Sequence, residues 1–488
     1  MGKNVIRLVD NSWYSESNAN FPLPEGFLTS HGKYTPSDVL NLVNSVNGYT
    51  IEELSDNEDG GILVWPQSFE KSHDKLLKKT ILECKIEEKK VKSLSTNNLV
   101  GYIGDGKAQI EINSRFCSNT DGNDYFLYHM LAKVFHANIV NMEVGEGSLK
   151  ELNLLIFMFP RLLKEALIQG VYKLYTKKEY NDSNLRGTVS INRHIRNNEP
   201  ANGKIAYSTR EFCYDNSMTQ LIRHTIEYIY TLPLGRTLLK GDKSIEECVR
   251  LITQLTSSYE KANRRKVMAE NKKLVNHPYY TKYKVLQKIC LAILKKERIS
   301  HGSQNNNVHG LLIDMSWLWE EYIATILQDN LTGFKHYTDN ESFKLFEKEN
   351  DKRFQSVIPD YLCECENGYN IVADAKYIPL HKYDHLNADR ASAVYYKTIM
   401  YMYRFHTNLG LLLHPCNKKD VEEIIDSNIE NDIITCDYKI ANDKDCHIYE
   451  IGFIVPEGND SFKEKIEKME MCFVEKITEI KSIYHKSF

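Results

Sequence analysis

The chain has 488 residues, of which 42% are hydrophobic and 26% are charged. This length is too great for one ordinary domain and fits two or three, and the composition is that of a globular protein with sizeable cores. The net charge of -4 excludes a uniformly basic protein that coats DNA. It does not exclude a nucleic-acid enzyme, because 62 Lys and Arg residues can gather on one face.

The 11 cysteines include no C-x-x-C pair, so the sequence predicts neither a zinc site nor a disulfide framework. The start of the chain lacks the apolar stretch of a signal peptide. The most apolar segment, residues 152–160, is far shorter than the roughly 20 residues that cross a bilayer. We therefore expect a soluble, cytoplasmic protein with reduced thiols, no membrane partner and a buried helix at 152–160.

The first two regions differ in their hydrophobic periodicity. Residues 1–120 predict an N-terminal β-containing domain for partner or DNA contact, because alternating segments such as 61–66 and 108–113 are typical of strands with one buried face. Residues 121–300 predict a mainly helical middle domain with a basic segment at 185–215. Its expected helices lie at residues 125–135, 152–175, 218–231 and 283–294.

The third region, residues 308–488, follows a polar linker at 301–307. A helix, a strand meander, a helix and further strands predict an α/β arrangement, and so a multidomain α+β protein as a whole. The helices are expected at 313–328, 389–405 and 461–484, and the strands within 356–365, 369–377, 409–414, 433–438 and 447–455.

Two carboxylates flank a predicted chain reversal in this region. Asn367-Gly368 between two alternating runs predicts a β-hairpin. Asp360 and Asp374 lie about equally far from this turn, so we expect them opposite each other, roughly 5 Å apart on one face. Lys376 follows Asp374 by two residues and shares that face.

Facing carboxylates repel each other, and a divalent cation between them would remove the repulsion. Mg²⁺ (or Mn²⁺) is the expected ion, because Mg²⁺ is typically held by one or two carboxylates plus water and phosphate oxygens. The backbone carbonyl of Ala375 could add a ligand, and Lys376 would place a positive charge beside the attacking water. The alternative is a solvated hairpin whose acids face water, because short D-x-K matches are common.

Pro359-Asp360 with Asp374-Ala375-Lys376, between an apolar strand and a helix, resembles the PD-(D/E)XK nuclease superfamily. Residues 313–322 (IDMSWLWEEY) resemble the helix that opens the nuclease domain of McrC-type restriction subunits, including those of LlaJI-like systems. Earlier blocks also resemble McrC proteins, and the likeness covers roughly residues 95–415. These blocks are Val100-Gly-Tyr-Ile-Gly with Ile110-Glu-Ile, Leu185-Arg-Gly, and Tyr207-Ser-Thr-Arg-Glu-Phe with Asp215.

The resemblance implies a PD-(D/E)XK restriction-endonuclease-like fold for residues 308–488 and an endonuclease subunit of a McrBC- or LlaJI-like system. Such subunits cut double-stranded DNA only with McrB-like AAA+ GTPase hexamers, whose GTP hydrolysis they stimulate. The GTP would be bound by that partner and not by this chain. Asp360, Asp374, Lys376 and Glu320 would be catalytic, and Mg²⁺ would be held by Asp360, Asp374, Glu320 and the backbone carbonyl of Ala375.

The resemblance also implies supporting residues on two helices. An acidic residue on the opening helix often assists the metal site; Glu320 is the better match and Glu321 its rival, since adjacent helical positions point about 100° apart. Relatives often carry Gln and Tyr after the D-x-K strand, where this chain has Lys397 and Tyr401, four residues apart on one helix face. For Lys397, a phosphate contact and a lysine lying along the surface are equal alternatives.

Residues 101–107 (GYIGDGK) fit the spacing of a P-loop, but two features oppose this interpretation. Ala108 stands where a P-loop has Ser or Thr, and the following residues alternate as a strand instead of opening a helix. We therefore expect a hairpin turn, with the GTPase supplied by another chain.

Basic and aromatic residues of the middle region could contact a partner or DNA. For the basic run 261–273, we favour a solvent-exposed helix face over contact with phosphates or a partner. Tyr279, Tyr280 and Tyr283 could stack bases, although tyrosines at this spacing more often pack a core. The residues that could contact phosphates or project into a partner ring are Arg186, Arg193, Arg196, Lys204 and Arg210.

The sequence thus predicts a metal-dependent DNA endonuclease subunit, and two alternatives share its features. One is a non-cleaving adaptor or GTPase activator, which the presence of Asp360, Asp374 and Lys376 disfavours. The other is a stand-alone PD-(D/E)XK nuclease of DNA repair or transposition, which would need no GTPase partner.

Overall fold

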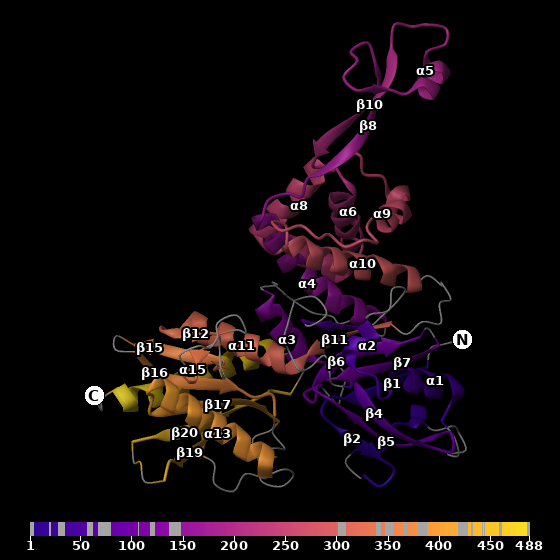
Figure 1. The fold of residues 1–488 in the computed structure, drawn as a ribbon. Helices are drawn as coiled ribbons and strands as arrows, with labels where there is room; N and C mark the ends of the chain where they lie inside the picture. The colour runs from indigo at the N-terminus through magenta and orange to yellow at the C-terminus, as the bar shows by residue number, and fades with distance from the viewer. Residues whose placement is uncertain are drawn as a thin grey trace. The chain divides into compact units, whose positions relative to one another are not determined.

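The structure is a computed structural model, and it forms two compact units (Figure 1). Unit 1 comprises Met1–Val134 and Gln304–Phe488, and unit 2 comprises Phe135–Ser303. The predicted domain boundaries at residues 120 and 308 stay predictions. The described residues are 4–18, 21–27, 35–55, 62–66, 80–105, 107–117, 123–135, 148–300, 309–337, 343–346, 356–365, 368–378, 388–417, 428–430, 433–441, 443, 445–457 and 461–485. The linker at 301–307, Gly106 and Asn367 lie outside them.

The first sheet of unit 1 joins segments that are far apart in sequence, in the order β1-β7-β6-β11-β3. Strand β11 (His309–Asp314) pairs antiparallel with β6 (Leu99–Gly104) and parallel with β3 (Ile62–Trp65). On the other side of β6, β7 (Ala108–Asn113) pairs antiparallel with β6 and parallel with β1 (Asn4–Val9). The antiparallel β6–β7 pair confirms the predicted hairpin in place of a P-loop.

Gly101 allows β6 and β11 to approach each other. Its φ is +145°, and a Cβ atom there would lie 2.1 Å from the backbone oxygen of Leu311. Only glycine adopts this conformation and leaves that space open.

A second, three-stranded sheet and three helices complete this part of unit 1. These elements are β2 (Trp13–Ser15), β4 (Leu82–Glu87), β5 (Lys90–Thr96), α1 (Ser37–Val46), α2 (Ile51–Ser55) and α3 (Tyr125–Val134).

The second large sheet of unit 1 is mixed. Its strand order is β12 (Phe334–His336), β15 (Tyr361–Cys365), β16 (Gly368–Ala375), β17 (Leu409–Cys416), β20 (His447–Ile454), β19 (Ile433–Lys439) and β18 (Asn428–Glu430). The β16–β17 and β17–β20 pairs are parallel, and the others are antiparallel. All residues of β17 are buried, as its continuous apolar run predicts for a central strand. A short β13 (Phe343–Lys344) pairs with β14 (Ser356–Val357).

Helices cover both faces of this sheet (Figure 1). They are α11 (Met315–Asn330), α13 (Ala388–Phe405) and α15 (Phe462–His485). Leu412 packs with Met402 of α13. The ring of Phe453 lies 6.1 Å from that of Trp319 in α11 and 5.6 Å from that of Phe473 in α15. Leu412 pairs with Glu450, so these two side chains lie on one face of the sheet. Phe453 follows Glu450 by three residues on β20, so its side chain lies on the other face. Helix α13 therefore covers one face, and α11 and α15 cover the other.

Unit 2 combines a helical body with a long hairpin. Strands β8 (Leu174–Asp182) and β10 (Ile205–Cys213) pair over their whole length, roughly 30 Å at 3.3–3.4 Å per residue. In Figure 1 they extend away from the helices of this unit, with β9 (Thr188–Val189) and α5 (Ile191–Asn198) at the far end. The helices are α4 (Ser148–Ile168), α6 (Ser217–Ile229), α7 (Pro233–Lys240), α8 (Lys243–Leu255), α9 (Arg264–Glu270) and α10 (Lys282–Ser300).

Two predicted helices have different limits in the structure. The helix expected at 152–175 ends at Ile168, because Gly170 has a φ of +91° and the chain then enters β8. The helix expected at 313–328 begins at Met315, because the Asp314 carboxylate accepts the backbone N–H of Ser316 (2.9 Å) and caps the helix. The apolar segment around Phe157 is buried in α4, as expected. Of the described helices, none has both the length and the apolar character needed to traverse a bilayer.

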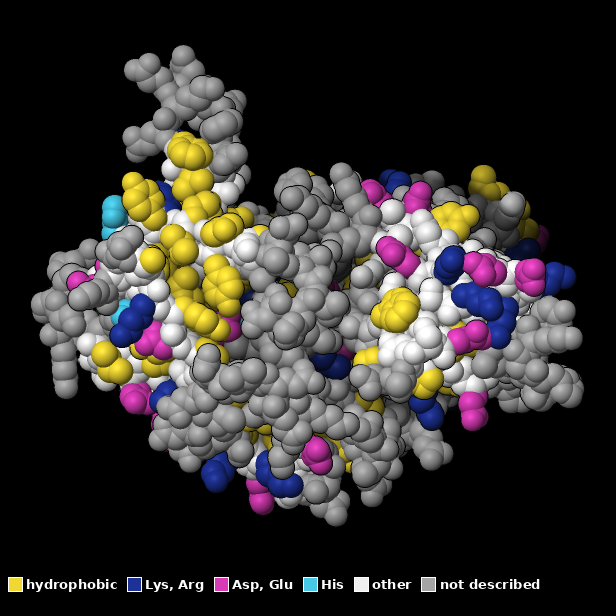
Figure 2. All heavy atoms as spheres, turned by 90° about the horizontal axis from the view of Figure 1, so that it is seen from below, with side chains coloured by type: hydrophobic (Ala, Val, Ile, Leu, Met, Phe, Trp, Pro, Cys, Tyr) yellow, Lys and Arg dark blue, Asp and Glu magenta, His cyan; other side chains and the backbone are white. Residues whose placement is uncertain are grey.

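Helix α13 presents apolar side chains to solvent on the side away from the sheet. Tyr396, Ile399 and Tyr403 follow each other along one helix face and are 69%, 38% and 82% exposed. The face of the molecule drawn in Figure 2 carries a band of hydrophobic side chains among scattered charged ones. The residues of α13 that face the sheet, including Met402, are instead buried.

Candidate active site

The hairpin β15–β16 places the two predicted acids at one end of the sheet. Tyr361 pairs with Ala373, so Asp360 and Asp374 occupy the next facing positions. The pairing of Cys365 with Gly368 confirms the predicted chain reversal. A β-bulge between Cys363 and Glu364 shifts the register on the turn side only, and the two aspartates keep their facing positions.

A single ammonium group lies against both carboxylates. The Nζ atom of Lys376 is 2.5 Å from Oδ2 of Asp374 and 3.9 Å from Oδ2 of Asp360. The backbone N–H of Ala375 also donates to Oδ2 of Asp360 (2.7 Å). Asp374 is completely buried, whereas the side chains of Asp360 and Lys376 are 15% and 17% exposed. The structure therefore brings together the three residues that the sequence assigns to catalysis.

The two carboxylates differ in their affinity for a proton. Burial, the nearby Asp374 and then Glu320 raise the pKa of Asp360 well above its usual value. Burial also acts to raise the pKa of Asp374, but Lys376 and Lys397 outweigh it, so the pKa of Asp374 is lowered. For Lys376, burial acts to lower the pKa, but the two aspartates outweigh it and raise the pKa. The group thus favours an ionised Asp374, a protonated Lys376 and a proton retained by Asp360.

The donor set suits a hard divalent cation. Both carboxylate oxygens of Asp374 are buried, and within the described residues neither accepts a hydrogen bond of suitable geometry. Across the described part of the chain, no three His, Cys, Asp or Glu side chains converge to hold a metal ion. Two carboxylates leave the remaining positions to water and phosphate oxygens, which is how Mg²⁺ is commonly bound. The role of the Ala375 carbonyl stays a prediction.

Glu320 lies close enough to act on Asp360 and is held by a residue that the sequence did not single out. Its Oε1 atom is 2.9 Å from Nε2 of His336, and its backbone oxygen accepts the hydroxyl of Tyr361 (2.5 Å). Glu320 contributes to the raised pKa of Asp360, after burial and Asp374. His336 belongs to no motif, and only the pairing of β12 with β15 brings it here.

Helix α13 adds Lys397 and Tyr401 to the site. The Nζ atom of Lys397 is 3.8 Å from Oδ2 of Asp374 and 5.1 Å from the centre of the Tyr401 ring. The hydroxyl of Tyr401 donates to the backbone oxygen of Ile358 (2.7 Å), two residues before Asp360. Lys397 therefore contacts the acid pair electrostatically, and Tyr401 holds the segment that leads into Asp360.

The basic residues predicted for contact with DNA or a partner lie along the hairpin of unit 2. Two of them stabilise the hairpin itself: Arg186 is 3.5 Å from Asp182, and Arg193 is 3.4 Å from Glu179. Because of these ion pairs, Arg186 and Arg193 are less available to bind DNA or a partner. The other three are exposed and form no ion pair with a described residue; they are Arg196, Lys204 and Arg210.

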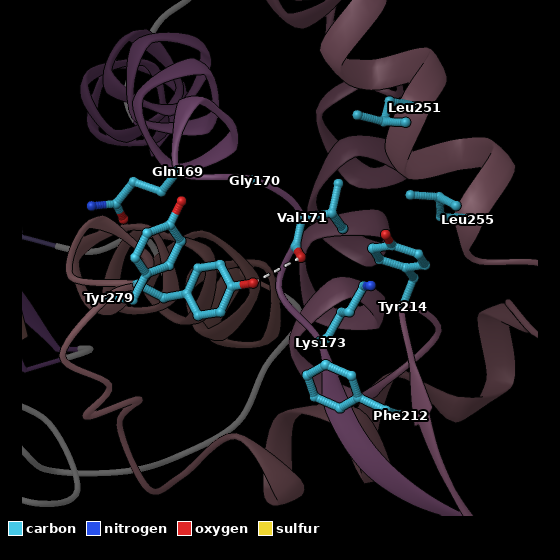
Figure 3. A pocket seen from close by; sticks show the side chains of 10 residues that line it. Gln169, Gly170, Val171, Lys173, Phe212, Tyr214, Leu251, Leu255 and Tyr279 are labelled. Atoms are coloured by element: carbon cyan, nitrogen blue, oxygen red, sulfur yellow. Dashed lines mark hydrogen bonds between the residues drawn. The ribbon is translucent and has the colours of Figure 1, made fainter.

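A cavity of about 520 Å³ opens at the base of this hairpin (Figure 3). Tyr279 and Tyr280 line it, and the Tyr280 hydroxyl donates to the backbone oxygen of Val171 (3.5 Å). Tyr283 is instead fully buried, so the prediction of a core role is confirmed for this tyrosine. Lys173 also lines the cavity, with its Nζ atom 4.3 Å from the centre of the Tyr214 ring.

Comparison with known proteins identifies the family. A family model described as "McrBC 5-methylcytosine restriction system component" matches residues 94–415, well over half of the chain. The chain belongs to this McrBC family. Its recognition from sequence as an McrC-type component is confirmed at this level, and the matched residues include Asp360, Asp374, Lys376, Lys397 and Tyr401.

Two solved structures are similar to the chain of this McrBC component, at low identity. One is from the refined half-complex of the tetradecameric assembly of Thermococcus gammatolerans McrB AAA+ hexamers with bound McrC. It has 13% identity and a TM-score of 0.48, with 98% of this chain and 100% of that chain covered. The other, from the Thermococcus gammatolerans McrBC complex, has 11% identity and a TM-score of 0.32, with 68% and 89% covered. No curated protein matches the chain.

Proposed function

We propose that this McrBC component is the DNA-cleaving subunit of its restriction system and hydrolyses phosphodiesters at a PD-(D/E)XK-type site with Mg²⁺. The observation that carries the proposal is the pair of buried carboxylates, Asp360 and Asp374, against the ammonium group of Lys376. An acid pair that merely faced water would have neither the burial nor the opposed pKa shifts of these two residues.

The residues of the chain divide the chemical work. Asp360 and Asp374 would hold the cation, with the Ala375 carbonyl as a further candidate ligand. Mg²⁺ bound there would polarise the phosphoryl group and lower the pKa of a coordinated water. Lys376, which lies against both acids, would supply positive charge to the attacking water or the developing phosphorane.

Glu320 would assist from α11. Its carboxylate is held by His336 and acts electrostatically on Asp360. We assign it the role of a positioning residue that orients water on the cation. His336 fixes the direction of the Glu320 side chain, as outer groups commonly do for residues around a metal.

We also propose that cleavage depends on McrB-like AAA+ GTPase hexamers, which would bind the GTP. Membership of the McrBC family supports this proposal, and the hairpin at residues 101–107 supports it by leaving no P-loop there. The exposed Arg196, Lys204 and Arg210 of the unit 2 hairpin are the candidate contacts to that partner or to double-stranded DNA.

A cleavage assay with the GTPase partner tests the proposal. We expect Asp374→Ala to lower DNA cleavage by more than about a hundredfold, the size typical of removing one preorganised electrostatic group. Stimulation of the partner's GTP hydrolysis should persist, since the assembly does not need this acid. Asp329→Ala, which removes an exposed acid on α11, is the matched control.

Each other outcome points to another function. Equal cleavage by Asp374→Ala and the wild type would overturn the proposed mechanism. GTPase stimulation by the wild type without Mg²⁺-dependent cleavage would identify an adaptor. Cleavage that needs no GTPase partner would instead identify a stand-alone nuclease.

A further inference from the structure

Two lysines converge on Asp374, and only one of them belongs to the D-x-K motif. Lys376 and Lys397 approach the same oxygen, Oδ2, at 2.5 and 3.8 Å. They reach it from different elements, the end of β16 and the middle of α13. Lys376 is 17% exposed and Lys397 is 43% exposed. Lys397 is therefore the more exposed of these two cations.

Two ammonium groups, Lys376 and Lys397, lie against the carboxyl groups of Asp360 and Asp374. Their positive charges at least offset the negative charge of the two acids before any cation binds. A divalent cation between the ionised acids would leave two excess positive charges among these four side chains, in a largely buried site where like charges repel more strongly than in water. The anionic phosphodiester of DNA and a hydroxide derived from the attacking water would together restore the balance.

We propose that Lys397 makes Mg²⁺ binding conditional on DNA, because its ammonium group neutralises Asp374 until a DNA phosphate draws it away. This inference rests on the proposed function and adds a regulatory role at the same site. Without DNA, the ammonium group of Lys397 competes with the cation for the carboxylate of Asp374. With DNA, the same ammonium group contacts a phosphate oxygen and competes less with the cation.

The surroundings of Lys397 allow this exchange. Its ammonium lies over the ring of Tyr401, whose hydroxyl is fixed to Ile358, and the lysine side chain as a whole is 43% exposed, so solvent and a phosphate can reach it. At 3.8 Å from Asp374 the lysine forms an ion pair without the short contact that Lys376 makes. Binding of Mg²⁺ and binding of DNA should then strengthen each other by the same factor.

Calorimetric titration of the full chain with Mg²⁺, with and without a short DNA duplex, tests the inference. The GTPase partner is left out, so that DNA is bound but not cut. We expect Lys397→Gln to bind Mg²⁺ about tenfold more tightly than the wild type without DNA, within the range typical of changes beside metal ligands. The gain in Mg²⁺ affinity on adding DNA should be large in the wild type and close to none in Lys397→Gln.

Three further variants make the result specific. Lys397→Arg keeps the charge and should keep the dependence on DNA. Lys463→Gln removes a lysine of α15 that pairs only with Glu467 among the described residues, and should match the wild type. Asp374→Asn should bind Mg²⁺ far more weakly than the wild type.

These variants separate a failure of the inference from a failure of the proposed function. Unchanged or weaker Mg²⁺ binding by Lys397→Gln, with Asp374→Asn still defective, would overturn the role of Lys397 alone. If the wild type and Asp374→Asn bind Mg²⁺ equally, or neither binds it, the metal site itself is wrong, and the inference fails with it.

Discussion

Asp360 and Asp374 share one site but have opposite effects on stability. Asp360, whose pKa is raised by burial and by Asp374, stabilises the fold below the ordinary pKa of an aspartate. That contribution is lost as the pH rises through its folded-state pKa. Asp374, whose pKa is lowered by its lysines against burial, stabilises the fold above the ordinary pKa and loses this effect as the pH falls.

We therefore expect Asp360→Asn and Asp374→Asn to have opposite effects in the absence of divalent cations. At pH 8, Asp360→Asn should raise the free energy of unfolding, because a neutral amide avoids the cost of ionising a buried carboxyl group beside Asp374. Asp374→Asn should lower it by about 3 kcal/mol, because it removes the closest charge from the buried Lys376. Urea unfolding with chelator measures both, and a destabilised Asp360→Asn would contradict the assignment.

The binding of Mg²⁺ should depend on pH through Asp360. The cation requires the ionised carboxylate, so the proton that Asp360 retains must leave when the cation binds. We expect Mg²⁺ affinity in the wild type to rise with pH through the raised pKa of Asp360, well above the range in which an ordinary aspartate titrates, with protons released. Calorimetry in two buffers of different ionisation enthalpy counts these protons. A pH-independent affinity with no proton release would show that Asp360 is ionised before binding.

For individual residues, the sequence predicts the relative positions of side chains where these residues lie close together on one strand or hairpin. Asp374 and Lys376 could be placed on one face from their spacing, and Asp360 from its distance to the turn. His336 could not be found, because its contact with Glu320 joins residues 16 positions apart that share no motif. The approach of Lys397 to Asp374 likewise depends on how α13 packs across the sheet, which local spacing does not determine.

Among the elements, α13 stabilises the site through one hydrogen bond to the strand segment before Asp360. Tyr401 is 2% exposed, and its hydroxyl donates to the backbone oxygen of Ile358. Tyr401→Phe should cost about 1 kcal/mol of unfolding free energy, the usual net value of one hydrogen bond. It should also weaken Mg²⁺ binding by loosening Asp360. Tyr403→Phe is the control, since Tyr403 is 82% exposed. If the two variants have the same unfolding free energy and the same Mg²⁺ affinity, the Tyr401 hydroxyl does not stabilise the site.

For residues 356–485, the presence of each strand and helix was predicted better than the residues at which it begins and ends. Asn367-Gly368 marked the hairpin, and the continuous apolar run of β17 marked a central strand. The predicted start of α11, residue 313, is two residues early, because Ile313 and Asp314 belong to β11. Their role as β11 follows from pairing with β6 and β3, strands more than 200 positions earlier in the chain.

In the molecule as a whole, Glu470 joins three helices of unit 1. Its carboxylate accepts the hydroxyl of Tyr322 in α11 (2.7 Å) and pairs with His129 (2.8 Å) and Lys133 in α3. Burial acts to raise the pKa of Glu470, but His129 and Lys133 outweigh it and lower the pKa. This network connects the helix that follows the first sheet with the helices that cover the second sheet.

Glu470→Ala should destabilise unit 1 by about 3 kcal/mol, because it leaves the buried hydroxyl of Tyr322 and the partly buried ammonium group of Lys133 without their partner. Glu479→Ala on the same helix should have little effect, since the side chain of Glu479 is 57% exposed and pairs with Lys476 at the surface. Chemical denaturation of the full chain measures both variants. A loss below about 1 kcal/mol for Glu470→Ala would show that the network contributes little.

The composition of the first sheet could not be predicted from the sequence. Its strands come from residues 4–113 and from β11, and patterns within a window of ten or twenty residues do not determine which distant strands pair. The hairpin of unit 2 was missed as a hairpin for a related reason. Most residues of β8 are exposed or partly exposed, so the strand lacks the alternation that marks one buried face.

The most direct test of a cation between Asp360 and Asp374 is anomalous X-ray diffraction from crystals of the full chain soaked in Mn²⁺. We expect an anomalous peak in contact with carboxylate oxygens of both residues, with the Lys376 ammonium displaced from between them. The same soak of Asp374→Asn crystals should lack this peak. If a saturating soak of the wild type shows no peak there, or a peak that contacts neither aspartate, Asp360 and Asp374 do not form a cation site.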